Sequence, residues 1–485
     1  MQNRWSIAGR GVVLSALALA LTACQSMRGP EPQVQPTTLV EQYVAPVATG
    51  PSVAELGYKD FFADQRLNQV IDLALNNNRD LRIAALNIQR AQQVYQISEN
   101  NQLPTIGASG GVLRQDTGSG TATRYNVGLG ATAYELDFWG RVRSLKDNAL
   151  DNYLATSSAR DATQITLISQ VAQAWLNYSF AKAQLGLAEK TLSTQLEAYN
   201  INKKRFDVGI DSALPMRQAQ ITVETAKSDV ANYKTQITQA QNLLNLLVGQ
   251  TVPSNLLPAA RVSRITTAST LRAGLPSDLL NNRPDLRAAE YQLSAAGANI
   301  AAAKARLYPT ISLTGTAGLA STSLSDLFKS GAFVWSLGPS LDIPLFDWGT
   351  RQNNIKISET DQQIALSNYE KSIQTAFREV NDALAVRQNI GDRIAAQRRL
   401  VDATNAAYQI SNSRFRAGID GFLTVLDAQR TAYAAEQGLL LLEQANLNNQ
   451  VEVYKTLGGG LKTYSNDEVL KTPSSAVINE NSANK

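Results

Sequence analysis

Histidine is absent from this 485-residue chain, and cysteine occurs once, at Cys24. The lack of histidine excludes Ser-His-Asp and Cys-His catalysis, His-ligated zinc or haem, and a histidine-based pH switch. A single cysteine excludes an intramolecular disulfide and a cysteine-rich metal site. The sequence also has no phosphate-binding loop, nucleophile motif or embedded carboxylate pair that indicates catalysis. We therefore predict that the protein is not an enzyme and uses no cofactor or metal.

Charged residues are also scarce, at 18% of the chain, against about a quarter in ordinary soluble domains. Lys and Arg number 45 and Asp and Glu 41, which leaves a net charge of +4. A chain so close to neutrality is not a nucleic-acid binder on electrostatic grounds. Beyond the N-terminal segment, no apolar run approaches the roughly 18 residues of a membrane-spanning helix. Any crossing of a membrane would therefore use strands.

The first 23 residues have the pattern of a secretory signal, with two arginines, an apolar run over 11–21 and then small residues. Leu21-Thr22-Ala23-Cys24 resembles a bacterial lipobox, which implies that Cys24 carries N-acyl and S-diacylglycerol lipid, palmitate among it. The alternative is a plain signal with an incidental cysteine. Residue 25 is Gln and not the Asp that resembles an inner-membrane retention signal, so the outer membrane is favoured.

The rest of the chain repeats one pattern in the same order, mostly at offsets of 205 to 209 residues. The matched segments are Asn78–Arg82 with Asn282–Arg287, Pro104–Ile106 with Pro309–Ile311, Trp139–Gly140 with Trp348–Gly349, Arg205–Asp211 with Arg414–Asp420, and Leu247–Gly249 with Thr456–Gly458. Chance is a poor explanation for a shared order of this length. We therefore predict two structural copies of one unit.

Each copy begins with a predicted helix, over 79–102 and 285–307, followed by a stretch rich in Gly, Ser and Thr. Alternation of side-chain types within these stretches predicts two strands per copy. We place the strands at 105–116, 122–138, 310–320 and 332–345. Each is long enough to cross a bilayer, which takes about 9–11 residues.

Long helices follow the strands. Proline is absent between Pro104 and Pro215 and between Pro344 and Pro473, and helix-forming residues dominate 140–203 and 349–412. At about 1.5 Å per residue, such a helix is about 96 Å long, which no globular core requires. Apolar residues recur every three to four positions, as in a coiled coil. We predict hairpin arms that turn near Gly209 and Gly418 and return over 212–249 and 421–457.

Together, the lipobox, the doubled order of elements and the paired Arg-Phe-x-x-Gly tips resemble the OprM/TolC-type outer-membrane efflux channels. Leu136–Arg141, Leu345–Gly349 and Asn281–Asp285 are similar to that family's strand-to-helix junctions and to its signature at the second repeat. The likeness is strongest to the lipoprotein branch near AdeC and AdeK, which serves resistance-nodulation-division (RND) drug pumps. It implies long α-helical coiled coils with a transmembrane β-barrel: a homotrimer with a twelve-stranded barrel continued by a twelve-helix periplasmic tunnel.

The resemblance also implies a division of the chain. It comprises a lipoprotein signal (1–23), a lipid-anchored tether (24–65), an equatorial domain with the tail (66–103, 250–308 and 458–485), barrel strands (104–139 and 309–347) and periplasmic hairpins (140–249 and 348–457).

Leu423, Asp427 and Arg430 resemble the family's periplasmic gate. In a trimer, Asp427 would place three carboxylates around one axis, and Leu423 would form an apolar constriction. Arg430 would take part in the contacts that hold this end shut. The alternative is that Asp427 and Arg430 are solvated helix charges three residues apart, able to pair weakly, with Leu423 in an ordinary helix core.

The hairpin tips resemble the motif that meets a periplasmic adaptor. The residues concerned are Arg205, Phe206, Val208, Gly209, Arg414, Phe415, Ala417 and Gly418. A helix turn alone could require the glycines, but it does not require phenylalanine, so we expect an exposed aromatic ring at both tips. Trp139 and Trp348 suit a membrane–periplasm interface, and packing at the strand–helix junction is the alternative.

The function implied is a passive exit duct in the outer membrane of a Gram-negative bacterium, lipid-anchored and in contact with outer-membrane lipid. It would open when a periplasmic adaptor (membrane fusion protein) and an inner-membrane RND transporter dock, and it would serve multidrug efflux. The alternative is a TolC-like duct for protein secretion or metal-ion export.

Overall fold

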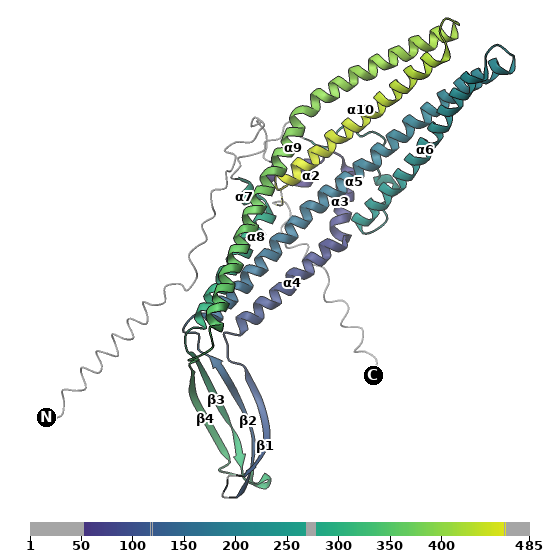
Figure 1. The fold of residues 1–485 in the computed structure, drawn as a ribbon. Helices are drawn as coiled ribbons and strands as arrows, with labels where there is room; N and C mark the ends of the chain where they lie inside the picture. Colours follow the sequence, from purple (N-terminus) through teal and green to yellow (C-terminus); the bar gives the residue numbers. More distant parts are fainter. Residues whose placement is uncertain (1–52, 117, 119, 268–277, 460, 462–485) are drawn as a thin grey trace. The chain divides into compact units, whose positions relative to one another are not determined.

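The computed structural model describes residues 53–116, 118, 120–267, 278–459 and 461 (Figure 1). The predicted signal, Cys24 and most of the C-terminal tail lie outside these residues. The chain divides into two compact units, which we describe separately. The first contains residues 85–158 and 286–372, and the second contains the described parts of 38–84, 159–285 and 373–485.

Helices and strands alternate in two similar series. In chain order they are η1 (Val53–Glu55), α2 (Tyr58–Phe61), α3 (Gln65–Asn77), α4 (Arg79–Asn100), β1 (Ile106–Asp116), β2 (Thr121–Glu135), α5 (Arg141–Asp207), α6 (Ala213–Val248), η2 (Ser254–Leu256), α7 (Asp278–Asn282), α8 (Pro284–Ala305), β3 (Thr310–Ser321), η3 (Leu324–Asp326), β4 (Phe333–Asp342), α9 (Thr350–Arg416) and α10 (Phe422–Thr456).

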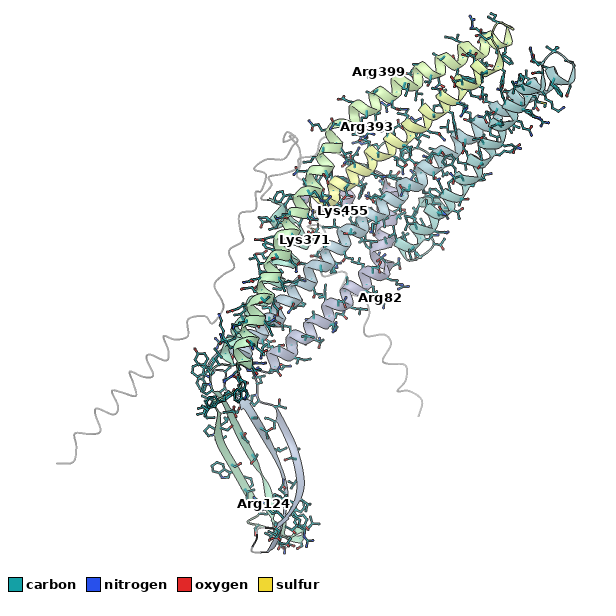
Figure 2. The ribbon with its side chains drawn as sticks, in the orientation of Figure 1. Arg82, Arg124, Lys371, Arg393, Arg399 and Lys455 are labelled. Carbon is teal, nitrogen blue, oxygen red and sulfur yellow. The ribbon has the colours of Figure 1, made fainter. Side chains whose placement is uncertain are left out.

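The first unit contains a four-stranded antiparallel sheet in the order β1-β2-β3-β4. β1 pairs with β2 without interruption, and β3 pairs with β4 in the same way. The register of β2 against β3 shifts between Ala131 and Tyr134, where Ala133 has a φ of 52°. Arg124 lies on β2 near the turn end of the sheet (Figure 2). Within the described residues, β1 and β4 each pair on one side only.

The two faces of this sheet differ in chemistry, as the register shows. One face is apolar and comprises Ile106, Val112, Tyr125, Val127, Leu129, Leu319, Phe333, Trp335, Leu337 and Leu341. The opposite face is mainly small and polar and comprises Gly107, Ser109, Gly111, Asn126, Gly128, Gly130, Thr314, Thr316, Gly318, Ser336, Gly338 and Ser340, with Leu113, Gln115, Arg124, Glu135, Val334 and Asp342 as larger members. We call them the apolar face and the small-residue face.

The four predicted strands are found, but two of them end earlier than predicted. β2 ends at Glu135 and not at 138, because the chain turns there and Asp137 caps the next helix. The Asp137 carboxylate accepts hydrogen bonds from the backbone N–H groups of Val142 (3.0 Å) and Arg143 (2.8 Å). β4 ends at Asp342 and not at 345, two residues before Pro344.

The second unit contains the ends of two helical hairpins, α5 with α6 and α9 with α10 (Figure 1). Both α5 and α9 run four residues further than predicted, to Asp207 and Arg416, because the Arg-Phe pair of each tip is still helical. The predicted apolar periodicity is confirmed along α9, where Ile373, Ala376 and Val380 are buried. Such a stripe is what joins helices along their length.

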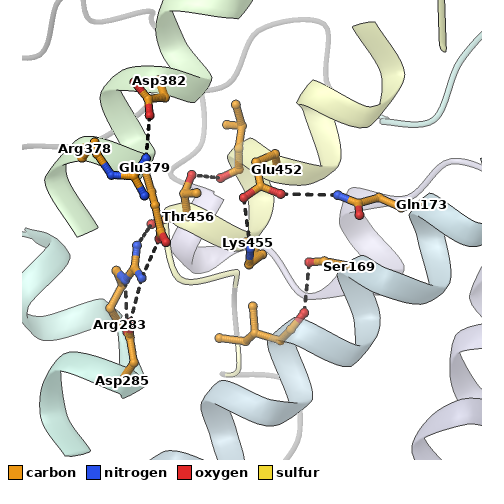
Figure 3. Close-up of polar contacts among 12 residues, drawn as sticks. Ser169, Gln173, Arg283, Asp285, Arg378, Glu379, Asp382, Glu452, Lys455 and Thr456 are labelled. Carbon is orange, nitrogen blue, oxygen red and sulfur yellow. Dashed lines mark hydrogen bonds and ion pairs between the residues drawn. The ribbon is translucent and has the colours of Figure 1, made fainter. Parts of the chain in front are cut away.

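Each repeat is closed by a contact between its first helix and its last. At the start of α4, the Asn78 side chain accepts the N–H of Leu81 (2.9 Å) and donates to the Leu247 carbonyl at the end of α6 (2.8 Å). Just before α8, the buried Arg283 donates to the Thr456 carbonyl at the end of α10 (3.3 Å) and pairs with Asp285 (2.7 Å) and Glu379 (2.9 Å; Figure 3). The repeated motifs thus mark where each repeat closes.

Candidate functional site

Both hairpin tips turn through the same backbone motif. Gly209 has a φ of 79°, and its N–H donates a hydrogen bond to the Phe206 carbonyl (2.9 Å). The Ile210 N–H donates to the Arg205 carbonyl (2.9 Å). This is a Schellman C-cap, in which the left-handed residue is normally glycine. The second tip repeats it at Gly418, which has a φ of 74° and equivalent bonds of 2.9 Å. The predicted turn positions at both glycines are therefore confirmed.

An ion pair braces each turn. Arg205 Nε lies 2.5 Å from Asp211 Oδ2, and Arg414 Nε lies 2.6 Å from Asp420 Oδ2. The hydrogen bond from Arg414 lowers the pKa of the Asp420 carboxyl below its usual value, and that pair in turn raises the pKa of Arg414. We did not single out Asp211 or Asp420 from the sequence. Their recurrence six residues after the matched arginines was the available signal.

The two tip phenylalanines lie in different environments. Phe206 is 40% exposed, whereas Phe415 is only 8% exposed. Phe415 packs against Phe422, with ring centroids 5.6 Å apart, and the Arg205 guanidinium lies over its ring at 5.7 Å. The prediction of an exposed aromatic ring at both tips is therefore wrong for Phe415, because Phe422 of its own hairpin and Arg205 of the other hairpin cover it.

Small aliphatic residues form the exposed crests of the tips. Val208 is 70% exposed, Ile210 is 66% exposed and Ile419 is 63% exposed, and Ala417 is exposed as well. Aliphatic side chains held on a rigid turn, with an arginine–carboxylate pair beside them, form a surface that an apolar helix end could contact.

The predicted gate residues share one face at the start of α10. Leu423 is 62% exposed, and Asp427 and Arg430 are also exposed. The opposite face packs into a core formed by Phe422, Val425 and Leu426 with Phe415 and Ala219. In the part of the chain that the structure describes, no ion pair joins Asp427 to Arg430, so the weak pairing considered from the sequence is not formed.

The matching face of α6 is not charged in the same way. Leu214 and Ile221 are 63% and 67% exposed, and they correspond to Leu423 and Arg430 at the offset of 209. Gln218 corresponds to Asp427 and is half-buried. The two repeats therefore have the same backbone conformation at the tips but differ in the charge that they expose there.

The junction tryptophans also differ. Trp139 donates from Nε1 to the Pro309 carbonyl (2.8 Å) and stacks on Tyr308 at 4.8 Å, so this residue packs at the strand–helix junction. Trp348 has a φ of 54° and is 99% exposed in the single chain. Asp347, which precedes it, accepts the N–H of Gly349 and of Arg351 (both 3.1 Å). We did not identify this second capping carboxylate, or Asp137, from the sequence.

Among the described residues, no helix is both long and apolar enough to cross a membrane. In the same residues, no group of three or more His, Cys, Asp or Glu side chains is placed to hold a metal ion.

Comparison with known proteins gives consistent matches. The sequence profile of the outer membrane efflux protein family matches residues 70–250 and 275–459. A probable efflux pump outer membrane protein of Pseudomonas putida, TtgC, is 39% identical over 465 residues, which cover 92% of this chain and 96% of that protein. The cation efflux system protein CusC of Escherichia coli is 37% identical over 455 residues, covering 92% and 97%. The MtrE outer membrane channel of Neisseria gonorrhoeae, solved in its open state, has a TM-score of 0.81 at 38% identity, covering 90% and 98%.

Proposed function

The chain belongs to the outer membrane efflux protein family, and we propose that it forms the exit duct of a tripartite multidrug efflux pump of the RND class. The observation that carries this proposal is the sheet with one apolar and one small-residue face, joined to two long helical hairpins. An apolar face suits lipid, and a small polar face suits a water-filled passage. No step of this function requires bond chemistry.

We further propose a homotrimer. β1 and β4 leave their outer backbone groups unpaired within the described sheet, and open strand edges are not tolerated in lipid. Four strands cannot close a barrel alone, whereas three chains would supply twelve. The same arithmetic applied to the four hairpin helices gives a twelve-helix tunnel.

At the far end of the hairpins, we propose that the tips dock a periplasmic adaptor that joins the duct to an inner-membrane RND transporter. The exposed crests at Val208 and Ala417 and the glycine turns beside them support this proposal. Leu423 and Asp427 would narrow the passage from their exposed face of α10, with Arg430 contributing to closure.

We also propose that a lipid on Cys24 anchors the N-terminus in the outer membrane. Cys24 lies outside the described residues, so the lipobox resemblance alone supports this anchor. Incorporation of labelled palmitate by the wild-type chain, and its loss in Cys24→Ala, is the expected result. Labelling that persists in the variant would refute the anchor.

The function is tested by fluorescent-dye accumulation in cells that lack this chain, with and without its restoration. We expect restoration to lower accumulation only while the proton gradient is intact, because a passive duct adds no energy of its own. A variant with Gly209 and Gly418 both changed to Trp should insert but not restore efflux, since the docking turns are lost. Unchanged dye accumulation with the wild-type chain would argue against drug efflux.

Metal-ion export is the second candidate, favoured by the likeness to the cation efflux protein CusC. The composition argues the other way, because the chain has no histidine and only three methionines to bind soft metal ions. Copper and silver sensitivity of the same strains separates the two functions. Restored metal tolerance without any change in dye accumulation would select metal export.

A further inference from the structure

Arg124 is a charged residue on the small-residue face of the sheet. It lies on β2 opposite Leu113 of β1, next to the turn end of both strands (Figure 2). β2 is an interior strand whose neighbours, β1 and β3, belong to the same chain. The face on which Arg124 lies is therefore determined within one chain and does not depend on how copies assemble.

The surroundings of Arg124 leave its charge uncompensated. Its side chain is exposed, and no ion pair joins it to another side chain within the described residues. The next positions on the same face of β2 are Asn126, Gly128 and Gly130, which carry no charge. No carboxylate on the same face of β2 therefore lies next to the guanidinium.

The other charges of the strands are either on the opposite face or at the opposite end. Arg114 and Asp116 of β1 alternate with Leu113 and so lie on the apolar face. On the small-residue face, Glu135 and Asp342 lie at the helix end of the sheet, and Glu135 pairs with Arg141 at 2.5 Å. Glu135 is 11 residues from Arg124, or about 35 Å along the strand.

We infer that Arg124 determines ion selectivity at the outer mouth of the duct. This inference rests on the proposed trimeric function, in which the small-residue face lines the passage and the strand turns face the cell exterior. Three copies of Arg124 then form a cationic ring, which raises the local concentration of anions and lowers that of cations. At the outer mouth, anionic solutes therefore pass more readily and cationic solutes less readily.

The test measures the reversal potential of the full-length chain in planar bilayers under a KCl gradient. We expect Arg124→Gln to lower the chloride-to-potassium permeability ratio about two- to fourfold at 10 mM salt, where the Debye length is about 30 Å. Arg124→Glu should lower the ratio further, and Arg124→Lys should keep it near the wild-type value. At 1 M salt the differences should nearly vanish, since the Debye length is then about 3 Å.

Arg114→Gln is the matched control, because it removes the same charge near the same end of the sheet on the apolar face. It should leave the ratio unchanged. The series is repeated in a chain that also carries Leu423→Ala and Asp427→Ala, so that the proposed constriction and carboxylates at the periplasmic end do not dominate the measured selectivity. Conducting Arg124 variants with the wild-type ratio, or an equal effect of Arg114→Gln, would overturn the inference while leaving the duct intact. A chain that carries no current even with Leu423→Ala and Asp427→Ala would overturn the duct and this inference with it.

Discussion

Glycines at the ends of the hairpin helices have the same backbone conformation but different surroundings. Gly209 and Gly249 both have a φ of 79°. A Cβ added at Gly209 meets nothing within 4 Å, whereas one added at Gly249 would lie 2.4 Å from the Asn77 carbonyl oxygen. Gly458 repeats the second case, at 2.6 Å from the Asn282 carbonyl oxygen. The tip glycine is needed for its φ alone, and the other two are needed for φ and for space.

The pair Gly209→Ala and Gly249→Ala separates these two requirements. Gly209→Ala should cost about 1 kcal/mol, the penalty of a left-handed alanine. Gly249→Ala should cost about 2–4 kcal/mol, because the clash with the backbone of Asn77 is added. The midpoint of thermal unfolding, followed by helical circular dichroism in detergent, measures both. Equal shifts of the midpoint would show that the close approach at Gly249 is relieved without cost.

At this scale, the glycine turns could be predicted from the sequence, because their effect is local, whereas the capping carboxylates of Asp137 and Asp347 were not identified. The Arg-Phe-x-x-Gly pattern contains what a helix end requires, and both predicted turns are found. The burial of Phe415 could not be predicted, because Phe422 and Arg205 cover it from other segments of the chain. The unequal exposure of Trp139 and Trp348 likewise depends on Tyr308, which only one of them contacts.

Among the elements, the sheet shows how side-chain alternation along single strands produces one apolar and one small-residue face. Each strand alone has a weak pattern, because glycine and serine are frequent on both faces. The register places the apolar residues of neighbouring strands on the same face. Val127 of β2, for example, pairs with Leu319 of β3 on one side and with Gly110 of β1 on the other. The strand ends were less predictable, because a bulge at Ala133 and a capping aspartate at Asp137 decide where β2 stops.

Lysine substitutions on adjacent residues of β2 test the assignment of the faces. Val127→Lys places a charge on the apolar face. If this face meets lipid as proposed, burial of the charge near the midplane costs about 2–4 kcal/mol. We expect it to reduce the amount of chain that is inserted in the outer membrane. Asn126→Lys is the matched control on the small-residue face, and it should insert normally. Membrane fractionation measures both, and a normal Val127→Lys combined with a failed Asn126→Lys would reverse the assignment.

In the whole molecule, duplication supplies two similar hairpins that differ in the side chains they expose near the tips. The repeats keep the turn, the ion pair and the closing contacts, all of which each copy requires to fold. They differ at the exposed positions near the tips, where Gln218 and Ile221 of one match Asp427 and Arg430 of the other. This difference could be predicted from the sequence, because the repeat aligns the positions. The exposure of Asp427 and Arg430 could not, because it depends on how Phe422 and its neighbours pack on the opposite face of α10.

The proposed gate is tested by removing both of its exposed uncharged and acidic side chains, Leu423 and Asp427, from α10. Leu423→Ala with Asp427→Ala should raise single-channel conductance about twofold or more, because the proposed apolar constriction and ring of carboxylates would be lost together. The fold should persist, since both side chains are exposed and the core behind them is untouched. Leu214→Ala with Gln218→Ala is the matched control on α6 and should leave conductance unchanged. If both double variants raise conductance equally, the two hairpins line the passage alike, and an unchanged value in the first would place the constriction elsewhere along the duct.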